Sequence, residues 1–123
     1  VIAYGEVAKV PGLTLLQGPG NDAVSSTALT AAGATLILFT TGRGTPLGFP
    51  VPTVKISSNS RLALHKPQWI DFDAGAMLQP GVSAEQFAFD FFRYLIAVAS
   101  GTKTCNERSD NKEIAIWKNG VTL

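Results

Sequence analysis

Leu36-Ile37-Leu38-Phe39 is a continuous apolar run, and Thr40-Thr41-Gly42-Arg43-Gly44-Thr45-Pro46-Leu47-Gly48 follows it directly. A short apolar run bounded by Gly33 and Gly42 predicts a strand buried on both faces. The loop after it has three glycines, which let a backbone approach a ligand closely, and Arg43, whose planar fork fits a carboxylate or phosphate. Open α/β sheets bind ligands where strands end, so the stretch predicts a ligand site. The alternative is a tight connection with an exposed arginine.

A second strand is predicted upstream, over the apolar residues 13–16, and it ends at Gly18-Pro19-Gly20. Asn21 or Asp22 is a good N-cap for an alanine-rich helix predicted over residues 23–32. A right-handed crossover makes the strands of such a unit parallel, so both glycine-rich loops are expected at one edge of the sheet. The first loop also precedes a helix N-terminus, which favours an anion.

A third strand is predicted over residues 53–56, followed by Ser57-Ser58-Asn59-Ser60. These polar residues either cap a short helix over residues 61–66 or bind substrate at the same edge, and both roles are compatible. His65, the only histidine, lies beside Lys66 on this short helix, which favours a solvated side chain over catalysis or metal ligation.

Trp69-Ile70-Asp71-Phe72-Asp73-Ala74-Gly75 alternates apolar and acidic residues, which predicts a strand with both carboxylates on one face. Two such carboxylates could bind a divalent cation or transfer protons; alternatively they face solvent, cap, or pair with a lysine. Asp73 is the better functional candidate, because it lies where the predicted strand ends.

The strongest helix prediction covers residues 84–100, with a Ser83-x-x-Gln86 capping box and Gly101 as its end. Its apolar residues follow helical spacing, and its four phenylalanines are expected in the core. Residues 102–123 are expected to pack on the domain as a C-terminal extension, with a strand-like run at 114–117 and a turn at Asn119-Gly120.

Composition bounds the class of protein. The chain has 123 residues, 46% hydrophobic and 15% charged, which fits one globular domain. A net charge of +1 gives no footprint for nucleic acid or an anionic membrane, and no apolar run approaches the roughly 20 residues of a membrane span. The single cysteine, Cys105, forms no internal disulfide and favours a reducing, cytoplasmic setting. The start at Val1, with Met77 the only methionine, predicts a piece of a longer protein.

Several common sites are not encoded. No Cys/His cluster has zinc spacing, and there is no Walker-A loop, dinucleotide fingerprint or nucleophile elbow. Pro46 follows Gly42-Arg43-Gly44 where a dinucleotide pattern needs a helix to start, so a nucleotide-binding half-domain fits poorly.

Five motifs, in this order and spacing, resemble the altronate/galactarate dehydratase family of sugar-acid hydro-lyases. They are Gly18-Pro19-Gly20-Asn21-Asp22 with Ser25-x-Thr27, Phe39-Thr40-Thr41-Gly42-Arg43-Gly44-Thr45-Pro46, Lys55-Ile56-Ser57-Ser58-Asn59, Trp69-Ile70-Asp71-Phe72-Asp73-Ala74-Gly75, and Ala99-Ser100-Gly101-x-x-Thr104-x-x-Glu107. The resemblance implies the C-terminal part of a longer enzyme that dehydrates altronate or galactarate to a 2-keto-3-deoxy acid. It raises Glu107 as a group that reaches a site, although a surface ion pair is the ordinary alternative.

The resemblance also implies a divalent metal, typically iron. His and Cys occur once each, so the metal ligands and the general base are expected mostly in the rest of the same polypeptide, and a homo-oligomer is possible. The expected fold is α/β, a Rossmann-like three-layer sandwich with a mainly parallel sheet and glycine-rich loops at its C-terminal edge. The expected site residues are Arg43 and Asp73 for catalysis, and Asn21, Asp22, Thr41, Gly42, Gly44, Thr45 and Asn59 for substrate binding. The alternative function is a non-catalytic anion-binding or subunit-contact module.

Overall fold

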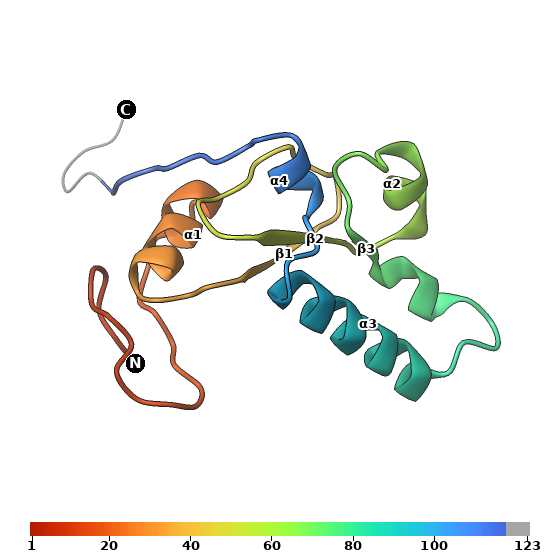
Figure 1. Ribbon diagram of the computed structural model, residues 1–123, viewed down its shortest axis with the longest axis horizontal. Helices are drawn as coiled ribbons and strands as arrows, with labels where there is room; N and C mark the ends of the chain where they lie inside the picture. Colours follow the sequence, from red (N-terminus) through yellow and green to blue (C-terminus); the bar gives the residue numbers. More distant parts are fainter. Residues whose placement is uncertain (118–123) are drawn as a thin grey trace.

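The computed structural model describes residues 1–117 and contains a three-stranded parallel sheet in the order β1-β2-β3 (Figure 1). The strands are β1 (Ile37–Thr41), β2 (Thr53–Ser57) and β3 (Phe72–Asp73). The helices are α1 (Asp22–Ala31), α2 (Ser60–His65), α3 (Ala84–Ala99) and α4 (Cys105–Arg108), and a 3-10 helix, η1 (Ala74–Leu78), follows β3. The predicted α/β class and the parallel direction of the strands are confirmed.

The central strand, β2, is buried along its whole length and organises two layers. Val54 and Ile56 form the core with Val98 of α3. The alternate residue Lys55 lies on the opposite side, where its Nζ is 5.4 Å from the centroid of the Phe39 ring. Figure 1 shows α3 and α4 on opposite sides of the sheet. The two faces of β2 therefore serve different purposes: one packs an apolar core and the other holds a buried cation.

The strand at residues 36–39 forms, but the prediction that it is buried on both faces is wrong. Ile37 is buried, whereas the side chain of Leu38 is 47% exposed. β1 pairs with β2 on one side, and it is an edge strand of the described sheet. An apolar run cannot reveal whether a neighbouring strand or helix covers its second face, so burial was overestimated.

The predicted strand at residues 13–16 does not join the sheet. Leu16 makes only an isolated parallel bridge with Ile2 of the N-terminal arm. The backbone N–H of Ile2 donates to the carbonyl of Leu15 at 2.8 Å, and Leu13 is 93% exposed. The predicted strand-helix-strand unit is therefore wrong: this segment pairs with the N-terminal arm and not with β1.

Helix α1 begins where the sequence predicts. The Asn21 side chain accepts hydrogen bonds from the backbone N–H groups of Ala23 and Val24, at 3.1 Å each. Gly33, at φ +111°, lies just beyond the C-cap Ala32 and takes a conformation that other residues adopt at a cost. These local signals set both ends of the helix without reference to the rest of the fold.

Helix α3 runs over the predicted residues, and Ser83 caps it by accepting from the N–H of Gln86. The reciprocal half of the predicted capping box is not among its contacts, because the Gln86 side chain donates to Asp90 instead. The prediction that all four phenylalanines lie in the core is also wrong: Phe89 and Phe92 are 54% and 59% exposed. No helix in the described part of the chain is both long enough and apolar enough to cross a membrane.

The C-terminal segment returns along the molecule without forming the predicted strand at residues 114–117. Its contacts are individual ones: the N–H of Ala115 donates to the Thr27 hydroxyl, and the ring of Trp117 meets that of Tyr4 edge-on at 4.8 Å. The backbone N–H groups of this run are bound by side chains instead of by a neighbouring strand, so the run is not part of a β-sheet. The predicted turn at Asn119-Gly120 lies outside the described residues.

Candidate functional site

The loop that leaves β1 is fixed by hydrogen bonds at its first turn. The hydroxyl of Thr41, the last residue of β1, accepts from the N–H of Gly44 at 3.0 Å. The Asn59 amide donates to the carbonyl of Gly42 at 3.1 Å, and the Lys66 ammonium donates to the carbonyl of Arg43 at 3.2 Å. The loop therefore presents Arg43 from a backbone held between the end of β1 and α2.

The second half of this loop is held from the other side of the sheet. The ammonium of Lys55 donates to the carbonyl of Thr45 at 2.6 Å. The amide of Asn106, on α4, donates to the carbonyl of Pro46 at 2.8 Å. The Lys55 bond is charge-assisted and so is stronger than the neutral bond from Asn106. The glycine-rich loop is thus pinned along its length rather than free to move.

Gly44 is required at its position for two reasons. Its φ is +79°, in the left-handed region. A Cβ built there would lie 2.9 Å from Cδ1 of Leu62 and 3.2 Å from Cδ of Lys66. The loop therefore packs directly against α2, which brings Arg43 beside that helix.

A hollow of about 310 Å³ lies between this loop and α2. It is lined by Gly42, Arg43, Asn59, Arg61, Leu62, His65 and Lys66. Its charged groups are all cationic: two guanidinium groups and one ammonium, with one imidazole beside them. Its volume is at the lower end of the range for small-molecule sites, about 300–1,000 Å³.

These cations are not neutralised by neighbouring acids. Among the described residues, the one ion pair within 4 Å joins Lys112 and Asp110, away from the hollow. The Lys66 ammonium already contacts the Arg43 carbonyl and the Trp69 ring, whose centroid is 4.5 Å away. Cations that line one space attract an anion, and an arginine fork matches a carboxylate or phosphate in both geometry and charge. The arrangement is chemically suited to hold a small anionic ligand.

The structure brings several of the predicted site residues together. Arg43, Gly42 and Asn59 line the hollow, and Thr41 and Gly44 are bonded to one another at its edge. Thr45 lies one residue further along the loop, where its carbonyl accepts the hydrogen bond from the Lys55 ammonium.

Asn21 and Asp22 are not among the residues that line this hollow. They lie at the start of α1, and Figure 1 shows α1 and α2 at opposite ends of the sheet. They are apart because the residue 13–16 strand, which was expected to bring the two loops together, is not in the sheet. Their role in substrate binding stays a prediction.

Asp73 lies at the C-terminal end of β3, in register with Ser57 and hence with Thr41 across the sheet edge. Its Oδ1 accepts from the Ser57 hydroxyl at 3.2 Å and from the N–H of Gly75 at 2.9 Å, which caps η1. Asp73 is not among the residues of the hollow, and its catalytic role stays a prediction.

The neighbouring carboxylate, Asp71, has a structural environment. Its Oδ2 accepts from the N–H of Lys55 at 2.8 Å, and its Oδ1 accepts from the N–H of Cys105 at 2.7 Å and the hydroxyl of Tyr94 at 3.4 Å. Asp71 and Asp73 share none of these partners. Asp71 thus ties the strand region to α3 and α4.

Burial and charge shift three groups around Asp71. Burial lowers the pKa of Lys55 from 10.5 to about 8, although the charges of Asp71 and Glu113 oppose this change. Burial, with the charge of Asp71, raises the pKa of Tyr94 to about 12 and that of Cys105 to about 11. Cys105 is therefore a poor source of thiolate, and its buried sulfur instead donates to the carbonyl of Ile70 at 3.5 Å and accepts from the Arg108 guanidinium at 2.9 Å.

Glu107 does not reach the hollow. Its Oε2 accepts from the N–H and the hydroxyl of Thr104, at 2.9 and 3.0 Å, and the Thr104 side chain caps α4 in return. The motif that ends in Glu107 therefore forms a capping box rather than a surface ion pair, and a role for Glu107 in a site stays a prediction.

Sequence reasoning missed three residues of the hollow: Arg61, His65 and Lys66. Arg61 and His65 are four residues apart on the predicted helix, a spacing that places side chains on one face. That spacing was a usable signal, but it does not say whether the face meets solvent or another loop. The sequence predicted that His65 is exposed, but it did not predict that His65 and Arg43 line the same hollow.

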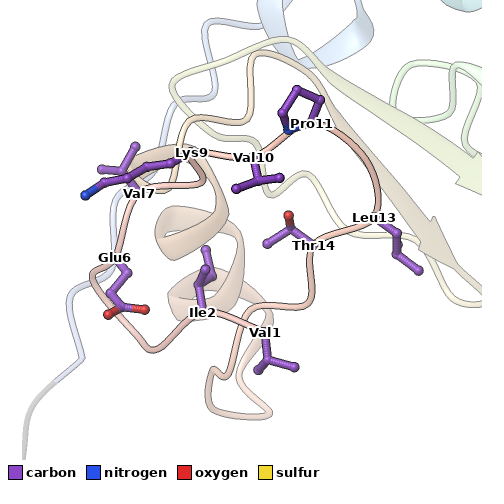
Figure 2. Close-up of a pocket in the computed structure, with 9 residues that line it drawn as sticks. All are labelled: Val1, Ile2, Glu6, Val7, Lys9, Val10, Pro11, Leu13 and Thr14. Atoms are coloured by element: carbon purple, nitrogen blue, oxygen red, sulfur yellow. The ribbon is translucent and has the colours of Figure 1, made fainter.

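A larger hollow, of about 590 Å³, is formed by the N-terminal arm (Figure 2). Figure 2 shows that its lining comes from one open loop within residues 1–14. Its two charged side chains are Glu6 and Lys9, and the Glu6 carboxylate accepts from the N–H of Ala3 at 2.7 Å. Its charged side chains are one acid and one base rather than a set of one sign, so the cationic hollow is the better candidate for an anionic ligand.

Comparisons with known proteins agree with the motifs. Residues 1–122 match the family described as D-galactarate/Altronate dehydratase, C-terminal. The chain is 54% identical over all 123 residues to altronate dehydratase of Bacillus subtilis and to altronate dehydratase of Escherichia coli. It is 34% identical over 104 residues, 84% of its length, to galactarate dehydratase (L-threo-forming) of Escherichia coli.

The chain spans only a quarter of the length of the two altronate dehydratases, and the galactarate dehydratase match covers 20% of that protein. The family match, by contrast, covers nearly the whole chain. The chain therefore belongs to the D-galactarate/altronate dehydratase C-terminal family.

Proposed function

We propose that this chain is the C-terminal domain of a hydro-lyase that removes water from a sugar acid, altronate or galactarate, and gives a 2-keto-3-deoxy acid. Relatives named altronate dehydratase and galactarate dehydratase support the reaction class. The observation that carries the proposal is the cationic hollow, which is lined by Arg43, Arg61 and Lys66 and by no acidic residue. A sugar acid has a carboxylate that such a hollow fits.

In this proposal the hollow binds and orients the substrate carboxylate. Dehydration begins with loss of the proton α to that carboxylate, and negative charge then builds on the carboxylate oxygens as an enediolate forms. Cations placed around those oxygens stabilise this charge more than the ground state, which lowers the barrier. The N–H of Gly44 is already hydrogen-bonded to the Thr41 hydroxyl. The cationic side chains of the hollow therefore contribute more to stabilising the enediolate than this loop amide does.

The general base is assigned to another part of the full-length protein. No carboxylate lines the hollow, and Asp71 accepts hydrogen bonds through both of its oxygens. His65 is the one lining group of a type that commonly transfers protons near neutral pH, and it is exposed. Asp73, at the C-terminal end of β3, does not line the hollow, and its predicted catalytic role is separate from that of the general base.

The residues of this chain do not fit a divalent metal such as iron. Among the described residues, no group of three or more His, Cys, Asp or Glu side chains is placed to hold one. The sulfur of Cys105 is buried beside Asp71, and its raised pKa disfavours the thiolate that a metal would bind. Any metal ligands of the enzyme are therefore assigned to the rest of the polypeptide.

The wider setting is part of the proposal. We infer a cytoplasmic enzyme, supported only by the lone Cys105, and a homo-oligomer as one form of assembly. The complete domain is proposed to be a Rossmann-like three-layer sandwich with its glycine-rich loop at the C-terminal edge. The uncovered side chain of Leu38 on β1 is consistent with further layers beyond the described residues.

One other function has support from a specific observation. A hollow lined by cations and lacking a base would also suit a module that binds a small anion, or contacts another subunit, without chemistry. In that case, loss of the Arg43 charge would change ligand binding or assembly but not turnover by the enzyme.

The proposal is tested by measuring 2-keto-3-deoxy acid formation from altronate and from galactarate, with iron supplied. The full-length protein is expected to turn over at least one of these acids. The 123-residue chain, under the same conditions, is expected to give none, because it lacks the base. Turnover by the short chain would contradict the assignment of the base, and no turnover by the full-length protein would contradict the reaction.

A further inference from the structure

Helix α3 has three distinct sides. The first packs on the sheet: Phe87 and Phe91 meet the ring of Phe72 at centroid distances of 5.3 and 4.7 Å. Further along the same side, Val98 is 3% exposed and completes the core with Val54 and Ile56. This side alone supplies the contacts that fix the helix on the sheet.

The second side is polar and is suited to solvent. Gln86, Asp90 and Arg93 follow one another at intervals of four and three residues, so they share one stripe of the helix. The Gln86 amide donates to the Asp90 carboxylate at 3.0 Å, and all three residues are exposed. A surface helix of a globular protein ordinarily needs only these two sides.

The third side is apolar and uncovered; we call it the outer apolar face of α3. It consists of Phe89, Phe92 and Ile96, also spaced three and four residues apart, with exposed fractions of 54%, 59% and 52%. Two phenylalanines and an isoleucine thus share one stripe, and at its edge the Arg93 guanidinium lies 5.9 Å from the centroid of the Phe89 ring. Such surfaces mark interaction sites, whereas singly scattered apolar residues do not.

The sheet is also incompletely covered on the side where α3 lies. Leu38 of β1 is in register with Val54 of β2, so the two side chains share a face of the sheet. Val54 is fully buried beneath α3, whereas Leu38 is 47% exposed. Both the helix and the adjoining strand thus leave apolar surface open within the described residues.

We propose that the outer apolar face of α3 is an internal interface, which another segment of the same full-length polypeptide covers. The length of the relatives supports this occupant, because the whole of this chain aligns with only 25% of the length of each altronate dehydratase. A protein of the relatives' size therefore has roughly three residues elsewhere for each residue here, and it has ample chain to bury this face. The polar stripe at Gln86, Asp90 and Arg93 stays in water.

This inference rests on the proposal that the chain is one domain of a full-length dehydratase, but not on the identity of the substrate. Two introduced cysteines on the same helix, each in a separate variant that keeps the native Cys105, test it in the full-length protein: Phe92→Cys on the outer apolar face, and Asp90→Cys on the polar stripe. Both positions are exposed in the described domain, so local opening of α3 affects them alike. Labelling by a maleimide is followed at each position by peptide mass spectrometry, with circular dichroism as the check on folding.

Phe92→Cys is expected to label at least tenfold more slowly than Asp90→Cys in the folded protein, and at the same rate in denaturant. Its protection should not change on dilution, because the occupant is part of the same chain. Equal rates in the folded protein would overturn the proposal. Protection that disappears on dilution would overturn it too, because a second copy would then be the occupant. A protected face in a protein that fails to dehydrate either sugar acid would contradict the proposed function and leave this interface standing.

Discussion

The ammonium of Lys55 lies 2.6 Å from the carbonyl oxygen of Thr45, and Lys55 has no exposed surface. The central strand β2 thus anchors the glycine-rich loop that carries Arg43. Burial lowers the pKa of the Lys55 ammonium that makes this contact. The loop is preorganised by the fold rather than by its own sequence, since its anchoring groups come from β2, α2 and α4.

The buried ammonium of Lys55 predicts that the free energy of unfolding increases with pH. Burial lowers the pKa of Lys55 from 10.5 to about 8, so the unfolded chain holds a proton between these values that the folded chain has released. The free energy of unfolding therefore rises with pH in that window through this group. Lys55→Met should remove this rise. Urea unfolding at a series of pH values measures it, and an unchanged pH profile in the variant would contradict the burial of the ammonium.

Tyr94 predicts the opposite slope at higher pH. Its pKa rises from 10.0 to about 12, mainly through burial, so the folded chain keeps a proton that the unfolded chain loses. The stability that this group contributes is present below pH 10 and is lost as the pH rises toward 12. Tyr94→Phe should flatten the alkaline decline. A decline that persists unchanged would show that Cys105, whose pKa is also raised, dominates it.

Gly44→Ala should destabilise the loop, whereas Gly42→Ala should be tolerated. Gly44 has a φ of +79°, and an added Cβ would lie 2.9 Å from Leu62. Forcing another residue into this backbone region costs about 1–2 kcal/mol before any overlap is counted. The Cβ at Gly42 would meet only the Ser58 hydroxyl, at 3.4 Å. Equal unfolding free energies for the two variants would refute the close packing of this loop on α2.

Asp71→Asn should cost more stability than Asp73→Asn. Asp71 accepts hydrogen bonds through both oxygens, so either orientation of an amide places an N–H against the donor of Lys55 or Cys105. Losing a hydrogen bond to a charged group costs about 1.5–3 kcal/mol, and Asp71 is partly buried. Asp73 accepts through Oδ1, which an asparagine keeps. Chemical denaturation compares the two, and a larger loss at Asp73 would mean that its second oxygen has a partner in the folded chain.

Much of the local structure could be predicted from the sequence. Asn21 and Ser83 cap α1 and α3, and Gly33 lies just beyond the end of α1, since each acts on backbone groups a few residues away. The turn after β1 and its arginine were equally evident, because a buried run followed by glycines is a local pattern. The predictions failed where a partner far along the chain decides the outcome.

Long-range pairings explain the failures. Residues 13–16 have the composition of a strand, but Ile2 pairs with Leu16 and keeps it from the sheet. Phe89 and Phe92 follow helical spacing as well as Phe87 does, and periodicity cannot tell a face that meets the sheet from one that meets nothing in the described domain. The same limit hid Arg61 and Lys66, whose place beside Arg43 depends on how the loop packs on α2.

The central claim, that the hollow around Arg43 holds the substrate carboxylate, is tested most directly by kinetics of the full-length enzyme. Arg43→Ala should lower kcat/KM on altronate or galactarate by about 10- to 100-fold, as expected for a lost charge-assisted hydrogen bond, with the fold intact by circular dichroism. Arg43→Lys should recover part of this loss, and Arg93→Ala, on the polar stripe of α3, should change little. If Arg43→Ala leaves both kcat and KM unchanged, the hollow does not take part in the reaction, and the domain is a scaffold.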